Sequence, residues 1–384
     1  MSEDLLNNEI QKVELEKINK IKQSIANLKE KKSKFLFVIP DSTTPVASVY
    51  EIYFHATTVK KMGFDVTILV EKDDYVIPKW IENKLTDFNH ISMSDSKLTV
   101  GPDSIMVIPE VYSNVMEQTK NLPCLRIGLL QSIDYMYNAL IPGTDWSTFG
   151  IRDIITTSPV MKEIVEMLFG KKFNVKTYQI GIPDYFEKSN LPKKPIISIV
   201  GRNPNEISKL IKMFYNKYPH YNWVMFDTML TKSKPPQQMR RIDFADRLKE
   251  HFAAVWIDRI SSFGTFPLEC IQSGVIPICL KPDIMPEYLI NRDENGVAIN
   301  AKNNSGIWTD NFYDLPIHIG EILTKFIDDS IPNEIYDNMD EIALKYNQET
   351  SEKTLISIYE EFVNQRILML ESAIPVENNN DNLK

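Results

Sequence analysis

Short apolar runs of strand length alternate with helix-length segments twice along this chain of 384 residues. Each run is continuous, which is typical of parallel strands buried on both faces. Strands of this kind, separated by helices, form a parallel sheet covered by helices. The first series has runs at 35–40, 65–70, 104–109, 125–130 and 153–158, and the second at 195–201, 222–227, 253–258 and 275–280. The sequence therefore predicts an α/β protein with two Rossmann-like domains.

The segments outside the two series suggest further elements. Residues 4–34 are predicted to form one long polar helix, because apolar side chains recur on one seam between lysines and glutamates. These are Ile18, Ile21, Ile25 and Leu28. The helix is expected to pack on the body of the protein or on a second copy, which would make a homodimer. The proline-rich stretch 181–195 is predicted to link the two domains.

The expected domain organisation follows from these boundaries. It comprises an N-terminal helical extension (1–34), a first Rossmann-like domain (35–186), a second (187–345), and a final helix with a frayed tail (346–384). The final helix is predicted to pack back on the first domain through one apolar face. That face consists of Leu355, Ile358, Phe362 and Leu368.

Composition disfavours several classes of protein. No run approaches the roughly 18 apolar residues that a spanning helix needs, so no membrane span is expected. The acidic, polar start has neither a basic region nor an apolar run, so no signal peptide is expected. Cys124, Cys270 and Cys279 are scattered, which fits a reducing environment. We therefore expect a cytoplasmic protein.

The net charge of −9 is concentrated at the C-terminal end. Residues 321–384 hold 14 acidic and 5 basic side chains, so the first 320 residues are neutral. A protein that depends on phosphate-backbone contacts normally shows a basic excess. The strongest basic run, 231–241, contains Lys232, Lys234, Arg240 and Arg241 and is interpreted first as a solvated loop.

Several familiar catalytic motifs are absent from the sequence. It has no GxGxxG, Walker loop, HExxH, GxSxG or Asp-x-Asp, and its five histidines show no metal-ligand spacing. Dehydrogenase, P-loop NTPase and zinc hydrolase functions are therefore disfavoured. Neither a metal nor a cofactor is expected.

The region 253–300 is the most informative part of the sequence. After a predicted strand, a loop of small residues opens a helix whose first turn contains Pro267, and such a helix N-terminus is a ready anion site. Glu269 lies one turn into this helix. Glu287 follows the next strand, at the sheet edge where ligands bind. The region is either a nucleotide-diphosphate site with a carboxylate for ribose hydroxyls, or a plain βαβ unit in which Glu269 caps the helix.

At these residues the sequence resembles the retaining GT-B glycosyltransferases of the glycogen-synthase-like and sucrose-synthase-like superfamily. That family carries E-G-F-G-x-x-x-x-E, a small-residue helix, a Pro-containing strand, a Pro-Glu loop and an Asn-Gly turn. The matching segments are SSFGTFPLE (261–269), CIQSG (270–274), VIPI (275–278), MPEYL (285–289) and ENG (294–296), with VGRN (200–203) upstream. The match is good over 178–300 and loose over 35–177.

The resemblance implies a GT-B fold, in which two Rossmann-like domains face a cleft and a C-terminal helix crosses back. It also implies sugar transfer from a nucleotide-diphosphate donor with retention of configuration. The sequence departs from the family at four places. Ser261 replaces the first glutamate, and the basic residue expected after Arg202 is absent, although Lys209 lies one turn further on. The first strand is followed by DSTTP instead of a glycine pair, and Gln131 replaces a histidine.

The resemblance also assigns roles to residues. Fixed positive groups and helix N-termini can neutralise a leaving diphosphate without a metal, and Arg202, Lys209 and Gln131 are the catalytic candidates. The donor-binding candidates are Ser261, Ser262, Phe263, Gly264, Thr265, Glu269 and Glu287. Glu269 would hold the ribose and Glu287 would lie near the sugar. Across the cleft, Thr43, Thr44 and Asp134 are acceptor-side candidates, although their segments are equally compatible with ordinary polar turns.

The expected function is therefore transfer of a sugar to an acceptor that could be a glycan, a small molecule, a protein or modified DNA. One alternative is glycosylation of modified bases in viral DNA, as some GT-B enzymes perform. The other is a non-catalytic GT-B-like binding or scaffold protein, which the changes at Ser261 and Gln131 favour.

Overall fold

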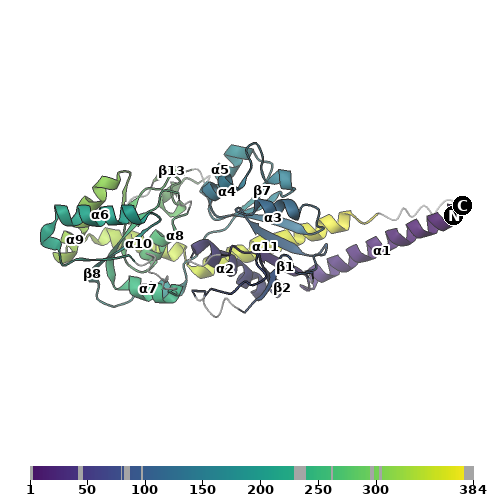
Figure 1. Cartoon of the computed structure of the whole chain (residues 1–384), viewed down its shortest axis with the longest axis horizontal. Helices are drawn as coiled ribbons and strands as arrows, with labels where there is room; N and C mark the ends of the chain where they lie inside the picture. Colours follow the sequence, from purple (N-terminus) through teal and green to yellow (C-terminus); the bar gives the residue numbers. More distant parts are fainter. Residues whose placement is uncertain are drawn as a thin grey trace.

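The computed structural model describes residues 3–41, 46–78, 80–81, 87–96, 98–228, 239–260, 263–294, 298–301 and 305–375. Two parallel sheets lie side by side with helices around them, and one long helix extends beyond the body (Figure 1). The candidate positions Thr43, Thr44, Ser261 and Ser262, and residues 231–238 of the basic run, lie outside the described residues.

The first domain contains a seven-stranded sheet of order β3-β2-β1-β4-β5-β6-β7, parallel throughout. Its strands are β1 (Lys34–Val38), β2 (Asp65–Val70), β3 (Asn89–Ser92), β4 (Ile105–Pro109), β5 (Leu125–Leu130), β6 (Asp153–Thr156) and β7 (Asn174–Thr177). Its helices are α2 (Ala47–Lys61), α3 (Ser113–Gln118), α4 (Ile133–Ala139) and α5 (Pro159–Phe169). The central strands are fully buried, as continuous apolar runs require.

The second domain contains a five-stranded parallel sheet of order β14-β11-β10-β8-β9. Its strands are β8 (Lys194–Gly201), β9 (Met225–Asp227), β10 (His251–Ile257), β11 (Ile276–Leu280) and β14 (Ile307–Thr309). Its helices are α6 (Pro204–Lys217), α7 (Arg241–Lys249), α8 (Thr265–Gln272), α9 (Leu315–Ile327) and α10 (Asn333–Lys345). A small antiparallel pair, β12 (Ile290–Arg292) and β13 (Ala298–Ala301), follows β11. The predicted α/β architecture of two Rossmann-like domains is thus confirmed.

Two long helices flank the first domain. α11 (Gln348–Ser372) runs along this domain and lies beside α1 (Glu3–Lys29), which continues past the body (Figure 1). On α1, Ile25 and Leu28 are buried, and Lys29 pairs with Glu371 of α11 at 2.8 Å. The C-terminal turns of α1 therefore pack on the protein's own body.

The apolar face of α11 differs from the predicted one at one position. Leu355, Ile358 and Phe362 are buried, but Leu368 is 66 % exposed. Six residues after Phe362 the helix has advanced by about one and two-thirds turns, so Leu368 points away from the core. Ile367 and Leu370 are buried instead.

The connections define where each sheet can bind a ligand. From β1 the first sheet continues to β2 on one side and to β4 on the other, and from β8 the second sheet continues to β9 and to β10. Ligands of open α/β sheets bind outside the carboxyl ends of the strands at such switch points. In the described part of the chain, no helix is both long and apolar enough to cross a membrane.

Candidate functional site

A cavity of about 260 Å³ lies between the two domains, at both switch points. From the first domain it is lined by residues of α2 and by the residues that follow β4 and β5. From the second domain it is lined by residues that follow β8 and β10 and by the first turn of α8. A second cavity of about 130 Å³ shares Val46, Ala47, Thr265 and Phe266 with it, so the two adjoin. Together they are near the lower end of the roughly 300–1,000 Å³ typical of ligand sites.

Arg202 emerges directly after β8 and lines the larger cavity, with a side chain 47 % exposed. Its Nε donates to Asp258 Oδ2 at 2.8 Å, and Asp258 directly follows β10. Its Nη1 donates to the hydroxyl of Tyr135 on α4 of the first domain. The guanidinium has five N–H donors in all. Arg202 therefore connects the two domains at the switch point while retaining donors for a ligand.

The N-terminus of α8 borders the same cavity. Its N-cap residue, Gly264, has φ 73° and ψ 54° and provides no side-chain cap. A Cβ at this position would lie 2.9 Å from the Tyr288 hydroxyl, which itself donates to the Gly264 carbonyl at 2.8 Å. Glycine is needed here for both the positive φ and the close approach. As a result, the first backbone N–H groups of α8, from Thr265 onward, are presented at the cavity, as an anion site requires.

Glu269, one turn into α8, lines the smaller cavity and is only 7 % exposed. Its Oε1 accepts hydrogen bonds from Arg241 Nε at 3.1 Å and Nη2 at 2.6 Å. Burial raises the pKa of the Glu269 carboxyl, and the positive charge of Arg241 limits that rise. Glu269 therefore does not cap its own helix but forms a buried ion pair with Arg241 of α7.

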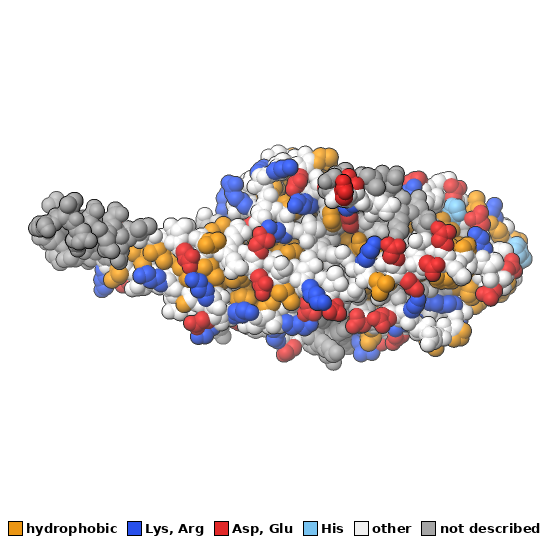
Figure 2. All heavy atoms as spheres, turned by 180° about the vertical axis from the view of Figure 1, so that it is seen from behind, with side chains coloured by type: hydrophobic (Ala, Val, Ile, Leu, Met, Phe, Trp, Pro, Cys, Tyr) orange, Lys and Arg blue, Asp and Glu red, His pale blue; other side chains and the backbone are white. Residues whose placement is uncertain are grey.

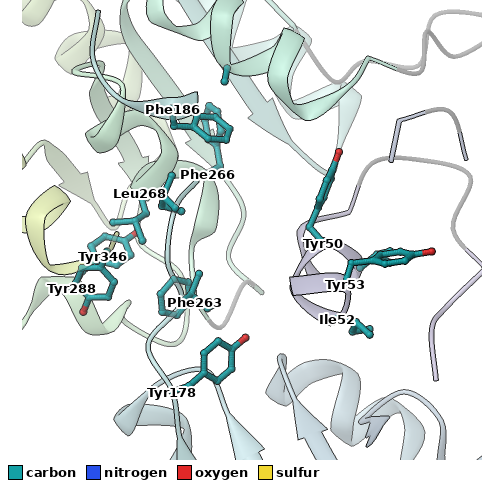
Figure 3. Close-up of a cluster of buried hydrophobic side chains, with 14 of the residues drawn as sticks. Tyr50, Ile52, Tyr53, Tyr178, Phe186, Phe263, Phe266, Leu268, Tyr288 and Tyr346 are labelled. Carbon is teal, nitrogen blue, oxygen red and sulfur yellow. The ribbon is translucent and has the colours of Figure 1, made fainter. Parts of the chain in front are cut away.

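Arg241 lies among aromatic side chains from both domains. Its guanidinium carbon is 4.7 Å from the ring centre of Tyr50 on α2 and 5.4 Å from that of Phe186. In Figure 3, Tyr50 and Tyr53 lie on one side, Phe186 and Phe266 on the other, and the Tyr178 hydroxyl points toward the space between them. This hydroxyl donates to Glu51 at 3.2 Å. Burial raises the pKa of the Glu51 carboxyl to about 7, and Arg241 limits the rise.

Glu110 directly follows β4 and lines the larger cavity from the first domain. It is 2 % exposed, and its Oε2 is buried with no hydrogen-bond partner among the described residues. Burial raises the pKa of this carboxyl to about 8, although the backbone N–H groups of Glu110, Gln131 and Ser132 favour the charged form.

The other sequence-predicted residues are distributed unevenly. Gln131 and Phe263 line the cavity, and Gln131 Nε2 donates to the Ser48 carbonyl at 3.0 Å. Asp134 lies in the first turn of α4 but is not among the lining residues. Lys209 lies on the exposed surface of α6, where its Nζ donates to the Tyr313 hydroxyl at 2.7 Å, and it does not line the cavity.

Glu287 takes part in a contact between the domains instead of lining the cavity. Both of its oxygens accept from the Arg292 guanidinium, and Oε2 also accepts from the backbone N–H of Val160 at 3.2 Å, in the first turn of α5. Arg292 in turn pairs with Glu163 of α5 at 2.5 Å. The expected place of Glu287 beside the sugar is not supported by these contacts.

A more voluminous cavity lies elsewhere. It measures about 790 Å³ and lies where the inter-domain segment meets α10 and α11. Four of its charged side chains form two ion pairs, Lys61–Glu352 and Lys188–Asp340. We place the candidate site in the two smaller cavities because the larger of them lies at the switch points and is lined by Glu110, whose Oε2 has no hydrogen-bond partner among the described residues. Among the described residues, no cluster of three His, Cys, Asp or Glu side chains is arranged to hold a metal ion.

No family model matches the sequence, and no curated protein sequence matches it either. Solved structures do match in three dimensions. Sucrose-phosphate synthase from Thermosynechococcus elongatus is 12 % identical, with a TM-score of 0.59 over 87 % of this chain and 100 % of that one. HepE from Anabaena, in complex with UDP and glucose, is 10 % identical, with a TM-score of 0.55 over 89 % and 100 %. The fold is GT-B.

A third solved structure of this fold carries DNA. It is an α-glucosyltransferase in complex with UDP and a 13-mer DNA containing an HMU base, 11 % identical, with a TM-score of 0.55 over 87 % of this chain and 100 % of that one. The GT-B fold implied by SSFGTFPLE and VGRN is thus confirmed, and at these identities the likeness concerns the fold.

Several residues of the site were not selected from the sequence, and four of them show why. Glu110 and Asp258 directly follow buried strands, which is the same signal that selected Arg202. Tyr135 and Arg241 carry no comparable signal, because their roles depend on which helices meet across the cleft.

Proposed function

We propose that this protein transfers a sugar from a nucleotide-diphosphate donor to an acceptor, and that the donor binds in the cleft between the two domains. The observation that carries the proposal is the position of Arg202, at a switch point and on the same cavity as the N-terminus of α8. A guanidinium and oriented backbone N–H groups at one cavity form a site for a diphosphate.

In this proposal the second domain binds the nucleotide part of the donor. Glu269 accepts hydrogen bonds from ribose hydroxyls in the smaller cavity, while Arg241 favours the charged form of its carboxyl. Tyr50 and Phe266 provide flat apolar walls in the same cavity, as a nucleobase requires.

Arg202 stabilises the charge that develops on the diphosphate as the bond to the sugar breaks. Such a contact stabilises the transition state more than the bound substrate when the hydrogen-bond donors of the protein are fixed in position before the reaction. The side chain is held by Asp258 and Tyr135, so its position is set before the donor binds. We propose that this stabilisation replaces a metal ion and that, as in the family the sequence resembles, transfer retains configuration.

Calorimetric titration with UDP, GDP, ADP and dTDP tests the proposal. We expect at least one diphosphate to bind the wild type and to bind Glu269→Gln about tenfold or more weakly, since charge-assisted hydrogen bonds contribute about 1.5–3 kcal/mol. Glu341→Gln, on the exposed surface of α10, is the matched control. If none of the four diphosphates binds, the proposal is wrong.

A modified base in DNA is the second candidate for the acceptor, motivated by the DNA-bound structure of the same fold. Figure 2 shows basic and acidic side chains intermixed over one face of the described residues, which does not favour it. DNA retention that declines steeply with salt would support this acceptor, and its absence would exclude it. A non-catalytic binding protein remains the other alternative, and it would bind the diphosphate without turning over any donor.

A further inference from the structure

Glu110 is a buried carboxyl that the proposed transfer chemistry does not use. Its Oε2 is shielded from solvent and accepts no hydrogen bond from the described residues. Buried polar atoms in native structures are nearly always hydrogen-bonded, and leaving one unpaired costs about 1–3 kcal/mol. Because Glu110 lines the cleft cavity, a ligand in that cavity can supply the missing partner.

The surroundings of Glu110 narrow the chemistry of that ligand. Gln131 lies beside it, since its backbone N–H is close enough to favour the charged form of the Glu110 carboxyl, and both residues line the cavity. The other ionisable lining groups nearby are Glu51 from α2, Tyr135 from α4, and the pair Arg202 and Asp258 from the second domain. The first-domain wall therefore offers hydrogen-bonding groups and, among its lining residues, no basic side chain, which suits hydroxyl groups better than an anionic group.

The protonation of the Glu110 carboxyl also suits a ligand with hydroxyl groups. Burial raises the pKa of Glu110 to about 8, so near neutral pH the group is largely protonated. A carboxylic acid both donates and accepts, as a hydroxyl does, and can pair with two hydroxyls of one ring.

We infer that Glu110, with Gln131 beside it, binds hydroxyls of a neutral sugar ring in the cleft and thereby determines which donor sugars are accepted. The inference rests on the proposed function. It adds the substrate class, a donor whose sugar is uncharged, and it assigns the recognition to the first domain, whereas the nucleotide is bound by the second.

Calorimetry with UDP, UDP-glucose, UDP-galactose, UDP-N-acetylglucosamine and UDP-glucuronic acid tests this inference at pH 7. The wild type should bind at least one of the neutral UDP-sugars more tightly than UDP and more tightly than UDP-glucuronic acid. Glu110→Ala should weaken that UDP-sugar about tenfold and leave UDP unchanged, because only the sugar contact is lost. Glu110→Gln should lose less UDP-sugar affinity, because the amide has nearly the shape of the carboxyl group and both donates and accepts hydrogen bonds. Glu117→Ala, exposed on α3, should change nothing.

Several outcomes would overturn the inference. One is a Glu110→Ala protein that retains the full preference for the UDP-sugar over UDP; another is a loss of UDP binding equal to the loss of UDP-sugar binding. A wild type that binds UDP-glucuronic acid most tightly, or that binds no neutral UDP-sugar better than UDP, would also contradict it. If Glu110→Ala does not fold, Glu110→Gln must show the sugar-specific loss with unchanged UDP affinity. If the wild type binds GDP, ADP or dTDP but not UDP, the same comparison is made with neutral and acidic sugar nucleotides of that base. A Glu110→Ala protein that keeps the full preference for the sugar nucleotide over its diphosphate then overturns this inference and leaves the proposed function standing.

Discussion

The guanidinium of Arg241 donates two hydrogen bonds to one oxygen of Glu269, and both side chains are at least nine-tenths buried. Arg241 begins α7 and Glu269 lies in α8, so the pair ties two helices of the second domain together beside the cleft. The carboxylate proposed to hold the ribose is thus also part of the structural core.

Loss of Arg241 is expected to destabilise the protein strongly. Arg241→Met leaves the Glu269 carboxyl buried without its partner, which costs about 3–5 kcal/mol of unfolding free energy. Adding Glu269→Gln should recover part of this loss, because the amide carries no charge. Urea unfolding of the two single variants and the double variant measures the coupling. Strictly additive effects would contradict the assignment of a buried ion pair between Arg241 and Glu269. Arg240→Met, at an exposed ion pair, is the control and should cost less than about 1 kcal/mol of unfolding free energy.

The stability of the protein is expected to depend on pH through Glu110. Its folded pKa of about 8 lies above the ordinary value of 4.5, so between these values the folded state binds more protons than the unfolded state. Glu110 therefore lowers the unfolding free energy progressively as the pH rises from about 4.5 to 8. Glu110→Gln should remove this contribution and be more stable, relative to the wild type, at pH 9 than at pH 5. Urea unfolding at pH 5, 7 and 9 measures the difference, and an equal difference at every pH would contradict the assignment.

The helix α11 is expected to be an integral part of the first domain. His55 Nδ1 lies 2.7 Å from the Tyr359 hydroxyl, and the Tyr359 ring meets Phe35 edge to face at 5.7 Å. Phe362→Ala should cost about 3–5 kcal/mol of unfolding free energy because its side chain is fully buried. Leu368→Ala should stay within about 0.5 kcal/mol because this side chain is exposed. Equal effects would show that the helix face is assigned wrongly.

Catalysis is expected not to require a divalent metal. The motivation is the absence of Asp-x-Asp from the sequence and the position of Arg202 on the same cavity as the α8 N-terminus. Nucleoside diphosphate release should be the same before and after treatment with EDTA. Activity that disappears with EDTA and returns with Mn²⁺ or Mg²⁺ would contradict this.

Much of the fold could be predicted because most of its strands have a clear sequence pattern. Runs such as 35–40 and 125–130 are continuous, apolar and bounded by polar turns, so their strand character depends on local sequence alone. Edge strands such as β3, β7 and β14 are short and only partly buried, so they give no such signal and were not predicted. Leu368 was misplaced because a list of apolar positions does not fix the helical phase.

The candidate site was predictable only for residues near the ends of predicted strands, because the carboxyl ends of parallel strands meet at one edge of the sheet. Arg202, Phe263 and Thr265 were selected from motifs near strand ends, and all three line the cavity. The partner of Glu269 was not predictable, because Arg241 belongs to a basic run that is compatible with an exposed loop. Arg241 is buried only because α7 packs beside α8 and Tyr50 covers it from the first domain.

Removal of the Arg202 charge should affect turnover more than donor binding. Arg202→Ala is expected to lower turnover by about a hundredfold or more, as when one fixed charge-stabilising donor is lost, while UDP affinity declines less. Arg202→Lys should retain only part of the wild-type turnover, because an ammonium group cannot make a bidentate contact with phosphate oxygens. Lys353→Ala, which removes an exposed ion pair with Glu349, is the control.

The most direct test of the central claim is the release of nucleoside diphosphate from a panel of nucleotide sugars, measured for wild type and Arg202→Ala at equal concentration. We expect release from at least one donor by the wild type, and release lowered about a hundredfold or more in a variant that melts at the same temperature. Equal release by the two proteins would show that Arg202 is structural. No release from any donor by folded wild-type protein would contradict the assignment of a glycosyltransferase activity.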